Sequence, residues 1–359
     1  MKKILIYLNS MQPAGGIERV VSTLANELCV DYHVTILVKD EPTSFYFLNE
    51  RIGMQTINAC LKLDMMSRFK RACSLFYSLF ISTFKLRAYF SKYSYDYIYV
   101  TTPLSFIECL FTFKVSNKII ASEHGARENY NRVYKVIKNI YKLAKVYVLP
   151  TTDDYTYYLS KGFPVVYIPH LRPSLPYIKT DVRQKRVINI GRFTADKRQL
   201  LLIRIWSKII IDSPELKNWE LLLVGQGELK DEIEKLINSL SMSDSIKILS
   251  PQKNVQELYS QASIFALTSS SEGFGMVLLE ALSFGLPVIS FDCPAGPKDI
   301  IENGRDGYLI KDDNYALYES KLRELMLNED SRLSMSESGF LKGQAWNDIK
   351  ILDKWRGLL

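Results

Sequence analysis

A glycine-rich turn with a carboxylate on each side is the part of the sequence best suited to chemistry. It lies in SSSEGFGMVLLEALSFG, residues 269–285. Gly273 and Gly275 would let the backbone approach a ligand closely. An apolar helix follows, and the free amides at the start of such a helix, with the helix dipole behind them, form an anion site. The residues supplying these amides are Phe274, Gly275, Met276 and Val277.

Two carboxylates flank this predicted anion site. Glu272 comes directly before the turn, and Glu280 lies about two turns further on. A purely structural interpretation makes Glu272 an acid at a helix start and Glu280 part of a solvated helix face. However, Glu280 is the only charged residue in MVLLEALSF (276–284). A carboxylate in so apolar a helix usually has a designated partner, which favours a functional role.

Apolar runs of strand length alternate with stretches of helical period in both halves of the chain. In the first half, strands are expected at 3–8 and 34–38, with a helix between them. In the second half they are expected at 186–193, 220–225, 246–250, 263–270 and 287–292. This alternation predicts an α/β protein with two doubly wound domains. Ligands of such sheets bind at the carboxyl ends of the strands, which is where the glycine-rich turn falls.

The segment LRPSLPYIKTDVRQKR (171–186) has two prolines and several charges, as is typical of a linker. We therefore divide the chain into domains 1–178 and 179–342, with a tail at 343–359. The 359 residues are 47% hydrophobic, enough for two cores. The five cysteines are odd in number and scattered, with no C-x-x-C pair, which argues against a disulfide framework or a zinc site and fits a reducing cytosol. The start of the chain has too short an apolar run for a signal peptide, and the longest uncharged run, 72–84, is too short to cross a membrane.

The E-x7-E pattern from Glu272 to Glu280 resembles the signature of the family 4 retaining glycosyltransferases, whose GT-B fold consists of two facing Rossmann-like domains. The other matches, in order, are GGIER (15–19), GRFTADK (191–197), VGQGEL (224–229) and NVQELYSQASIFALTSSSEG (254–273). One departure is Arg198, which stands where the family has a glycine. The tail has Trp346, Ile349, Leu352 and Trp355 at helical spacing. It resembles the last GT-B helix, which crosses back to the first domain.

The resemblance implies a nucleotide-sugar site in domain 179–342. Arg192 and Lys197 would hold the diphosphate and stabilise it as it leaves, a task that suits cations. No metal is then required, and the sequence contains no D-x-D motif. Glu280 would accept hydrogen bonds from the ribose hydroxyls, and Glu272 would face the donor sugar near its anomeric carbon. No cofactor is expected beyond the nucleotide sugar as co-substrate.

Two sites in the first domain follow from the same resemblance. Gly15 and Gly16 would approach the diphosphate from the other side, although such a pair also suits a plain turn. His124, in SEHG (122–125) after the expected strand 118–122, would face the donor and acceptor sugars. A lone histidine can equally be a packing or capping residue. We assign no role to His33 or His170.

The expected activity is retaining transfer of a hexose or N-acetylhexosamine from a UDP-sugar, rather than a GDP-sugar, to a lipid-linked or polysaccharide acceptor. FDCPAGPKDII (291–301) most resembles bacterial enzymes that build capsular, lipopolysaccharide or other lipid-linked glycans. In this family, retention suggests front-face attack. The alternative is a sugar-nucleotide epimerase with the GT-B fold. A nicotinamide dehydrogenase would need G-x-G-x-x-G where the chain has NSMQPAGG (9–16).

Basic charge is concentrated in the first half of the chain. Residues 1–178 hold 22 basic and 13 acidic side chains, a net charge of +9, whereas residues 179–359 carry −2. The positive net charge of residues 1–178 is suited to binding an anionic surface or a polyanion. No nucleic-acid motif accompanies the charge, so we expect no nucleic-acid partner, although a basic nucleic-acid-binding module is an alternative of another class.

Two segments of the basic half predict peripheral attachment to the inner face of the plasma membrane. Residues 65–90 contain five basic and no acidic side chains, and Phe69, Phe76, Phe80 and Phe84 would share one helical face. In the second segment, 132–145, one helical stripe would hold Arg132, Lys135, Lys138, Lys142 and Lys145. The alternatives are an aromatic face buried in the core and a solvated basic face. We favour the membrane and a cytoplasmic location.

Overall fold

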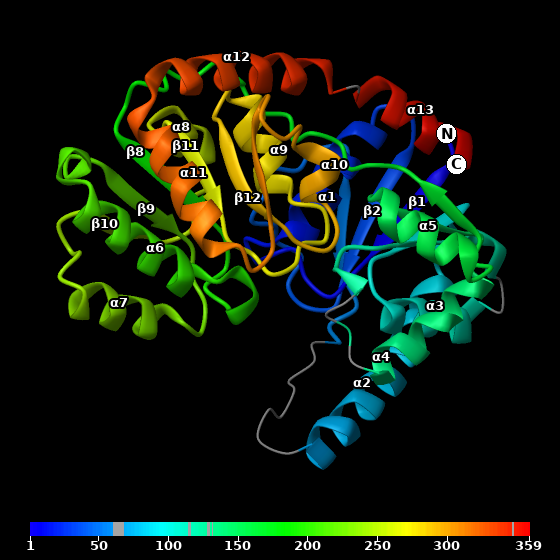
Figure 1. The fold of residues 1–359 in the computed structure, drawn as a ribbon. Helices are drawn as coiled ribbons and strands as arrows, with labels where there is room; N and C mark the ends of the chain where they lie inside the picture. Colours follow the sequence, from blue (N-terminus) through cyan, green and yellow to red (C-terminus); the bar gives the residue numbers. More distant parts are fainter. Residues whose placement is uncertain (60–67, 114–115, 128–129, 131, 347) are drawn as a thin grey trace. The chain divides into compact units, whose positions relative to one another are not determined.

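A computed structural model of the chain describes residues 1–59, 68–113, 116–127, 130, 132–346 and 348–359 (Figure 1). The chain forms two compact units. The N-terminal unit contains Met1–His124, Tyr130–Leu171 and Ile349–Leu359, and the C-terminal unit contains Gly125–Asn129 and Arg172–Asp348. The domain boundary predicted from the sequence, after residue 178, lies seven residues beyond Leu171.

The N-terminal unit is built on a seven-stranded parallel sheet in the order β3-β2-β1-β4-β5-β6-β7. Its strands are β1 (Lys3–Tyr7), β2 (His33–Val38), β3 (Gly53–Thr56), β4 (Tyr97–Val100), β5 (Ile119–Ser122), β6 (Val146–Leu149) and β7 (Val165–Tyr167). Its helices include α1 (Gly16–Leu28), α2 (Arg68–Phe90), α3 (Pro103–Phe113), α4 (Arg132–Ile137) and α5 (Thr152–Ser160), with 3-10 turns η1 (Ser116–Lys118) and η3 (Lys138–Leu143). Strands β5 and β6 are buried throughout, as is typical of a parallel sheet covered on both faces.

The C-terminal unit contains a six-stranded parallel sheet in the order β10-β9-β8-β11-β12-β13. Its strands are β8 (Arg186–Ile190), β9 (Glu220–Val224), β10 (Ile246–Leu249), β11 (Ile264–Leu267), β12 (Val288–Asp292) and β13 (Gly307–Lys311). Its helices include α6 (Gln199–Asp212), α7 (Lys230–Ser239), α8 (Val255–Ser260), α9 (Met276–Ser283), α10 (Pro297–Ile300), α11 (Tyr315–Leu327) and α12 (Glu329–Ala345), with 3-10 turns η4 (Ala195–Lys197) and η5 (Pro214–Leu216). The two parallel sheets confirm the predicted α/β class.

Both sheets reverse their strand order beside the first strand of the unit. In the N-terminal sheet β1 lies between β2 and β4, and in the C-terminal sheet β8 lies between β9 and β11. The loops on either side of such a switch point diverge to opposite faces of the sheet and leave room for a ligand at the carboxyl ends. In the C-terminal sheet these are the loops after β8 and β11, which contain Lys197 and Glu272.

The last helix, α13 (Asp348–Leu358), packs into the N-terminal unit. Trp355 is 5% exposed and meets Tyr99 of β4 edge to face, with ring centroids 5.7 Å apart. The four residues noted at helical spacing in the tail do not all lie on one buried helix face. Ile349 is 70% exposed, Ile351 is buried in its place, and Trp346 lies outside α13.

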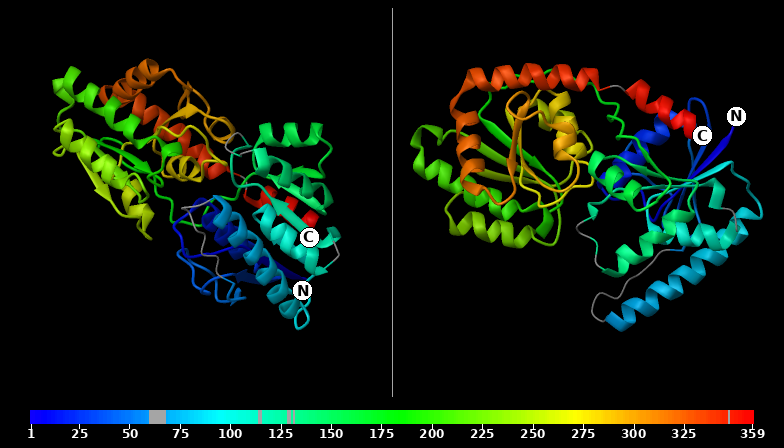
Figure 2. Two further views of the ribbon diagram at one scale, coloured as in Figure 1. Left: turned by 90° about the horizontal axis from the view of Figure 1, so that it is seen from below. Right: turned by 45° about the vertical axis from the view of Figure 1, so that its right-hand side comes forward.

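The structure excludes the core alternative for the first expected membrane segment at Phe80 and Phe84, and it contradicts the basic stripe expected for the second. Helix α2 packs against α3 (Figure 2), and Phe80 and Phe84 are 72% and 69% exposed, so they are not core residues. Residues 65–67 and the side chains of Phe69 and Phe76 lie outside the described part of the chain. The single basic stripe over 132–145 is wrong, because α4 gives way to η3 and Lys138 is buried. No described helix is long and apolar enough to cross a bilayer.

Candidate functional site

The glycine-rich turn after β11 has a backbone that only particular residues can adopt. Gly275, at the N-cap of α9, has φ 92°, a left-handed conformation that side chains disfavour. The turn packs on the loop after β12, where Gly296 has φ 101° and an added Cβ would lie 2.0 Å from the Phe274 carbonyl oxygen. The Glu272 amide also donates to the Pro294 carbonyl at 3.3 Å. Gly296 thus shapes the site, although the sequence pattern alone does not point to it.

The fixed turn presents the predicted amides at the start of α9. The first amides of a helix have no acceptor within it, so those of Met276 and Val277 are directed away from the helix body. Phe274 and Met276 are buried, and the Phe274 ring meets Trp346 edge to face at 6.1 Å. The side chains therefore anchor the turn while its backbone polar groups form the site.

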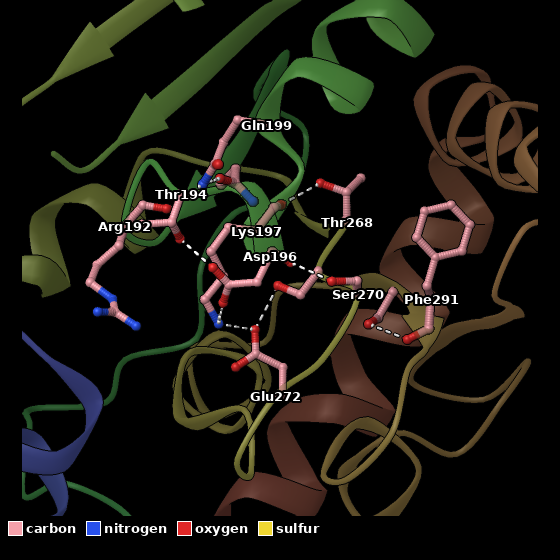
Figure 3. A network of polar contacts seen from close by, with 12 residues as sticks. Arg192, Thr194, Asp196, Lys197, Gln199, Thr268, Ser270, Glu272 and Phe291 are labelled. Carbon is pink, nitrogen blue, oxygen red and sulfur yellow. Dashed lines mark hydrogen bonds and ion pairs between the residues drawn. The ribbon is translucent and has the colours of Figure 1, made fainter. Parts of the chain in front are cut away.

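Lys197 and Glu272 meet at the carboxyl edge of the C-terminal sheet (Figure 3). Lys197 Nζ lies 2.7 Å from Glu272 Oε1, and the same oxygen accepts a hydrogen bond from Ser269 Oγ at 2.6 Å. The two side chains are 17% and 10% exposed. The ammonium also lies 3.9 Å from Asp196 Oδ2, and because it has three donors, at least one remains for a phosphate. The structure brings these two predicted residues together.

The turn that holds Lys197 is tied to the end of β11. The Ser270 amide donates to the Asp196 carbonyl at 2.8 Å, and Thr268 Oγ1 lies 3.1 Å from the carbonyl oxygens of Lys197 and Arg198 (Figure 3). Thr268 is fully buried. These contacts fix the backbone on both sides of Lys197, which directs its ammonium toward Glu272.

Arg192 comes from the same loop, but its side chain is exposed. Its carbonyl accepts a hydrogen bond from Gln199 Nε2 at 3.0 Å, which fixes the backbone. Among the described residues, its guanidinium forms no ion pair, and in Figure 3 it lies to one side of Lys197 and Glu272 without a contact to either. Arg192 is therefore a cation on the surface of the unit, next to the buried part of the site.

Glu280 has the partner that its apolar surroundings predict. It is 4% exposed in α9, and Tyr259 at the end of α8 donates its hydroxyl to Glu280 Oε2 at 3.1 Å. A buried carboxylate held in this way remains available as an acceptor for further hydroxyl groups. Its burial excludes the solvated-face interpretation.

In the N-terminal unit, Gly15 and Gly16 lie where β1 leads into α1. Gly15 is the N-cap residue of α1, and Gly16 begins the helix. A Cβ added to Gly15 would lie 2.2 Å from Glu18 Oε2, so the Glu18 carboxylate is folded back over the helix start. The pair thus lies at the carboxyl edge of the N-terminal sheet, at its switch point.

His124 follows β5 at the same edge of the N-terminal sheet. Its Nε2 lies 3.2 Å from the Tyr99 hydroxyl, and its ring stacks on that of His170 at 5.5 Å with an interplanar angle of 11°. Burial lowers the pKa of His124 to about 4 and also lowers that of His170. His124 therefore presents a neutral imidazole, which can exchange hydrogen bonds with a sugar. His170, to which the sequence pattern assigns no role, also follows the end of a strand, β7.

A buried ion pair between Lys138 and Glu123 holds the loop that contains His124. Glu123 accepts hydrogen bonds from the His124 amide at 3.0 Å, from the Tyr130 hydroxyl at 2.8 Å, and from Lys138 and the Tyr147 hydroxyl. Glu123 is 3% and Lys138 2% exposed. Lys138 thus belongs to the interior of the unit, which corrects its expected place on a basic surface.

The described residues include no cluster of three or more His, Cys, Asp or Glu that could hold a metal ion. Lys197 and Arg192 supply cationic side chains at this edge of the sheet. The site can therefore bind an anion at a helix start, with Lys197 and Arg192 nearby and a buried carboxylate within α9.

Comparison with known proteins agrees with this geometry. Residues 178–342 match the model of the family described as "Glycosyl transferases group 1". The chain is 28% identical to the amylovoran biosynthesis glycosyltransferase AmsD of Erwinia amylovora, over all of both chains. It is also 27% identical to an α-1,4-N-acetyl-D-galactosaminyltransferase of Campylobacter jejuni, over 91% of this chain and 89% of the relative. The name of that relative gives a diNAcBac-PP-undecaprenol glycan as its substrate.

Among solved structures, a point mutant of TarM of S. aureus superposes on the chain with a TM-score of 0.81. The identity is 16%, over 100% of this chain and 99% of TarM, so the likeness concerns the fold alone. That structure is a complex with fondaparinux, α-GlcNAc-glycerol and UDP. Residues 178–342 thus belong to the glycosyl transferases group 1 family, and the protein is a glycosyltransferase with the GT-B fold.

Proposed function

We propose that the protein transfers a hexose or N-acetylhexosamine from UDP to a lipid-linked or polysaccharide acceptor, with retention at the anomeric carbon. The observation that carries this proposal is the Lys197–Glu272 pair beside the glycine-rich turn. Glu280 is buried in α9, the helix that follows this turn. The C. jejuni relative, which acts on an undecaprenol-linked glycan, supports the acceptor class. TarM, which was solved with UDP, supports the nucleotide.

The residues of the C-terminal unit would divide the work on the donor. The amides of the glycine-rich turn and the Lys197 ammonium would bind the diphosphate, while the exposed Arg192 would add a second positive charge. Glu280 would accept hydrogen bonds from the ribose hydroxyls. As the glycosidic bond to phosphate breaks, negative charge grows on the diphosphate, and preorganised cations stabilise that charge most in the transition state.

In the proposed front-face reaction, the acceptor oxygen bonds to the anomeric carbon on the side from which the diphosphate leaves. The acceptor proton passes to the departing phosphate oxygen, so charge balances without a protein nucleophile. Glu272 Oε1 already accepts hydrogen bonds from Lys197 and Ser269, which lowers its nucleophilicity. Glu272 then orients the sugar and holds Lys197, and the side-chain cations would make the reaction independent of a metal.

We further propose that the protein attaches peripherally to an anionic membrane surface through α2. Tyr77, Phe80 and Phe84 are each about 70% exposed, although large aromatic side chains are usually buried. Arg87 of the same helix is exposed, and the first half of the chain carries a net charge of +9. An aromatic face with basic neighbours suits the boundary between lipid headgroups and acyl chains. This surface would hold the enzyme beside a lipid-linked acceptor.

The donor class is tested by incubating the full chain with UDP-glucose, UDP-galactose, their N-acetylated counterparts and GDP-mannose, and measuring nucleotide release. Release of UDP from one of the UDP-sugars is expected, at a rate that falls steeply in Glu272→Gln. A GDP-sugar as the preferred substrate would contradict the proposed donor. Conversion of a UDP-sugar to its epimer without transfer would instead support the epimerase alternative.

A further inference from the structure

Arg198 has a backbone conformation that is unusual for its residue type. It lies between η4 and α6 with φ 51° and ψ 38°, in the left-handed region. A residue with a Cβ is disfavoured there, and the glycosyltransferases that the chain resembles have glycine at this position. A strained residue that persists next to a functional site must be held by its surroundings.

The Arg198 guanidinium is held by Asp312, which directly follows the edge strand β13. Arg198 Nη1 donates to Asp312 Oδ1 at 2.6 Å, and Nη2 donates to Oδ2 at 3.3 Å. Both side chains are about one quarter exposed. A two-point contact between guanidinium and carboxylate fixes orientation as well as distance. The pair therefore ties the loop after the central strand β8 to the loop after β13.

The Arg198–Asp312 pair completes the fixation of the turn that carries Lys197. On the N-terminal side, the Asp196 carbonyl accepts from the Ser270 amide. On the C-terminal side, Thr268 binds the Arg198 carbonyl and Asp312 binds the guanidinium. Asp312 Oδ1 also accepts a hydrogen bond from the Asp313 amide at 3.1 Å, so the carboxylate itself is oriented.

We infer that Arg198 and Asp312 form a positioning clamp that sets the Lys197 ammonium for the diphosphate of the donor. The inference rests on the proposed function of Lys197. In this arrangement Arg198 acts through Lys197 and does not bind the donor itself, because its two Nη groups already donate to Asp312. A glycine at this position would adopt the left-handed backbone without strain. Here the Arg198–Asp312 clamp holds that backbone conformation instead.

The test is calorimetric titration of the full chain with UDP. Arg198→Gly keeps the left-handed backbone accessible and removes only the clamp. Asp312→Asn removes the negative charge that holds the Arg198 guanidinium. Each is expected to weaken UDP binding about tenfold, and the double variant should be no weaker than either single one. The matched control is Arg186→Gln, which removes the Arg186–Glu220 pair at 2.8 Å. That pair joins the amino ends of β8 and β9, so UDP affinity should not change.

The decisive measurement repeats Arg198→Gly in a Lys197→Ala background. If the clamp acts through Lys197, the double variant Lys197→Ala, Arg198→Gly binds UDP with the same affinity as Lys197→Ala alone. A further tenfold loss in that background would overturn the inference and make Arg198 a direct ligand. If both Arg198→Gly and Asp312→Asn bind UDP with wild-type affinity, the inference is also overturned. This holds even if the two variants have a lower melting temperature. If Lys197→Ala binds UDP as tightly as the wild type, the proposed role of Lys197 fails instead, whatever the Arg198 variants show.

Discussion

Glu280 is buried in an apolar helix and is hydrogen bonded to Tyr259. A hydrogen bond to a charged group contributes about 1.5–3 kcal/mol. Replacing Glu280 by Ala should therefore weaken UDP binding by roughly tenfold to a hundredfold. The control is Tyr259→Phe, which removes the tyrosine hydroxyl but leaves the carboxylate in place, and its affinity should change much less. Unchanged calorimetric affinity in Glu280→Ala would refute the ribose assignment.

Lys197 and Arg192 are the cations proposed to replace a metal. Activity should survive EDTA, because the positive charge near the diphosphate comes from side chains. Lys197→Ala should lower the turnover number by at least about a hundredfold, since it removes the cation and also frees Glu272 from its ion pair. Initial rates of UDP release measure both effects. Loss of wild-type activity on chelation, with recovery on adding magnesium or manganese, would show that a metal is required.

The two buried histidines of the N-terminal unit, His124 and His170, should make its stability depend on pH. Burial holds the pKa of His124 at about 4, below its ordinary value of 6.5. Between these values the unfolded chain binds a proton that the folded chain does not, so the free energy of unfolding falls as pH falls through this window. His124 should contribute about 1–3 kcal/mol of this change.

Urea unfolding at pH 7, 6 and 5 measures this dependence. His124→Gln should flatten the profile, since glutamine does not titrate in this range. His33 is exposed, so His33→Gln is the matched control and should retain the wild-type slope. A slope that is identical in all three proteins would exclude His124 as its source.

At the scale of elements, α2 is the proposed contact with the membrane. The full chain should float with vesicles containing anionic lipid, stay behind with neutral vesicles, and dissociate at high salt, because each basic residue near an anionic leaflet contributes about 1 kcal/mol. The double variant Phe80→Ser, Phe84→Ser should float much less. Phe47 is equally exposed, at 77%, but lies outside α2, so Phe47→Ser is the control and should float normally. Failure of the wild type to bind anionic vesicles at low salt would contradict the proposal.

Most strands could be predicted because a parallel sheet covered on both faces needs continuous apolar runs, such as Ile264–Leu267 of β11. Strand β3 shows the limit of this signal. Its sequence GMQT is only partly buried at the sheet edge, and it has no apolar run to detect. The E-x7-E carboxylates could also be predicted, since Glu280 is conspicuous in an apolar helix.

Tertiary partners could not be predicted in the same way. In the sequence, Lys138 falls on a regular basic stripe, because helical spacing carries no information about the Glu123 carboxylate 15 residues away. The stacking of His124 on His170 likewise depends on the order of β5, β6 and β7 in the sheet. A single sequence contains strand positions, but not which loop ends become neighbours.

At the scale of the whole molecule, the chain crosses from the N-terminal unit to the C-terminal unit and then returns with α13. Ile351, Leu352 and Trp355 are buried in the N-terminal unit. Ending the chain after residue 346 should therefore lower the melting temperature of the N-terminal unit by several degrees or more, because burying one large apolar side chain contributes about 1.5–3 kcal/mol. The C-terminal unit should melt as in the full chain.

Hydrogen exchange resolved along the sequence separates these two effects. Faster exchange is expected in β1 and β4, which pack near α13, and wild-type exchange in β8 and β11. The control is Ile349→Ser in the full chain, since Ile349 is 70% exposed on the same helix. Equal loss of protection in both units would mean that α13 stabilises the molecule as a whole.

The return of α13 also determines the order in which the protein can mature on the ribosome. Residues 1–171 emerge first, yet the surface around Tyr99 stays uncovered until Trp355 has been synthesised. Residues 172–355 must be translated during that interval, and at about 5–20 residues per second this takes roughly 10–40 s. The nascent N-terminal unit therefore exposes this apolar surface throughout that interval, whereas the C-terminal unit can complete its sheet as soon as its own residues have emerged.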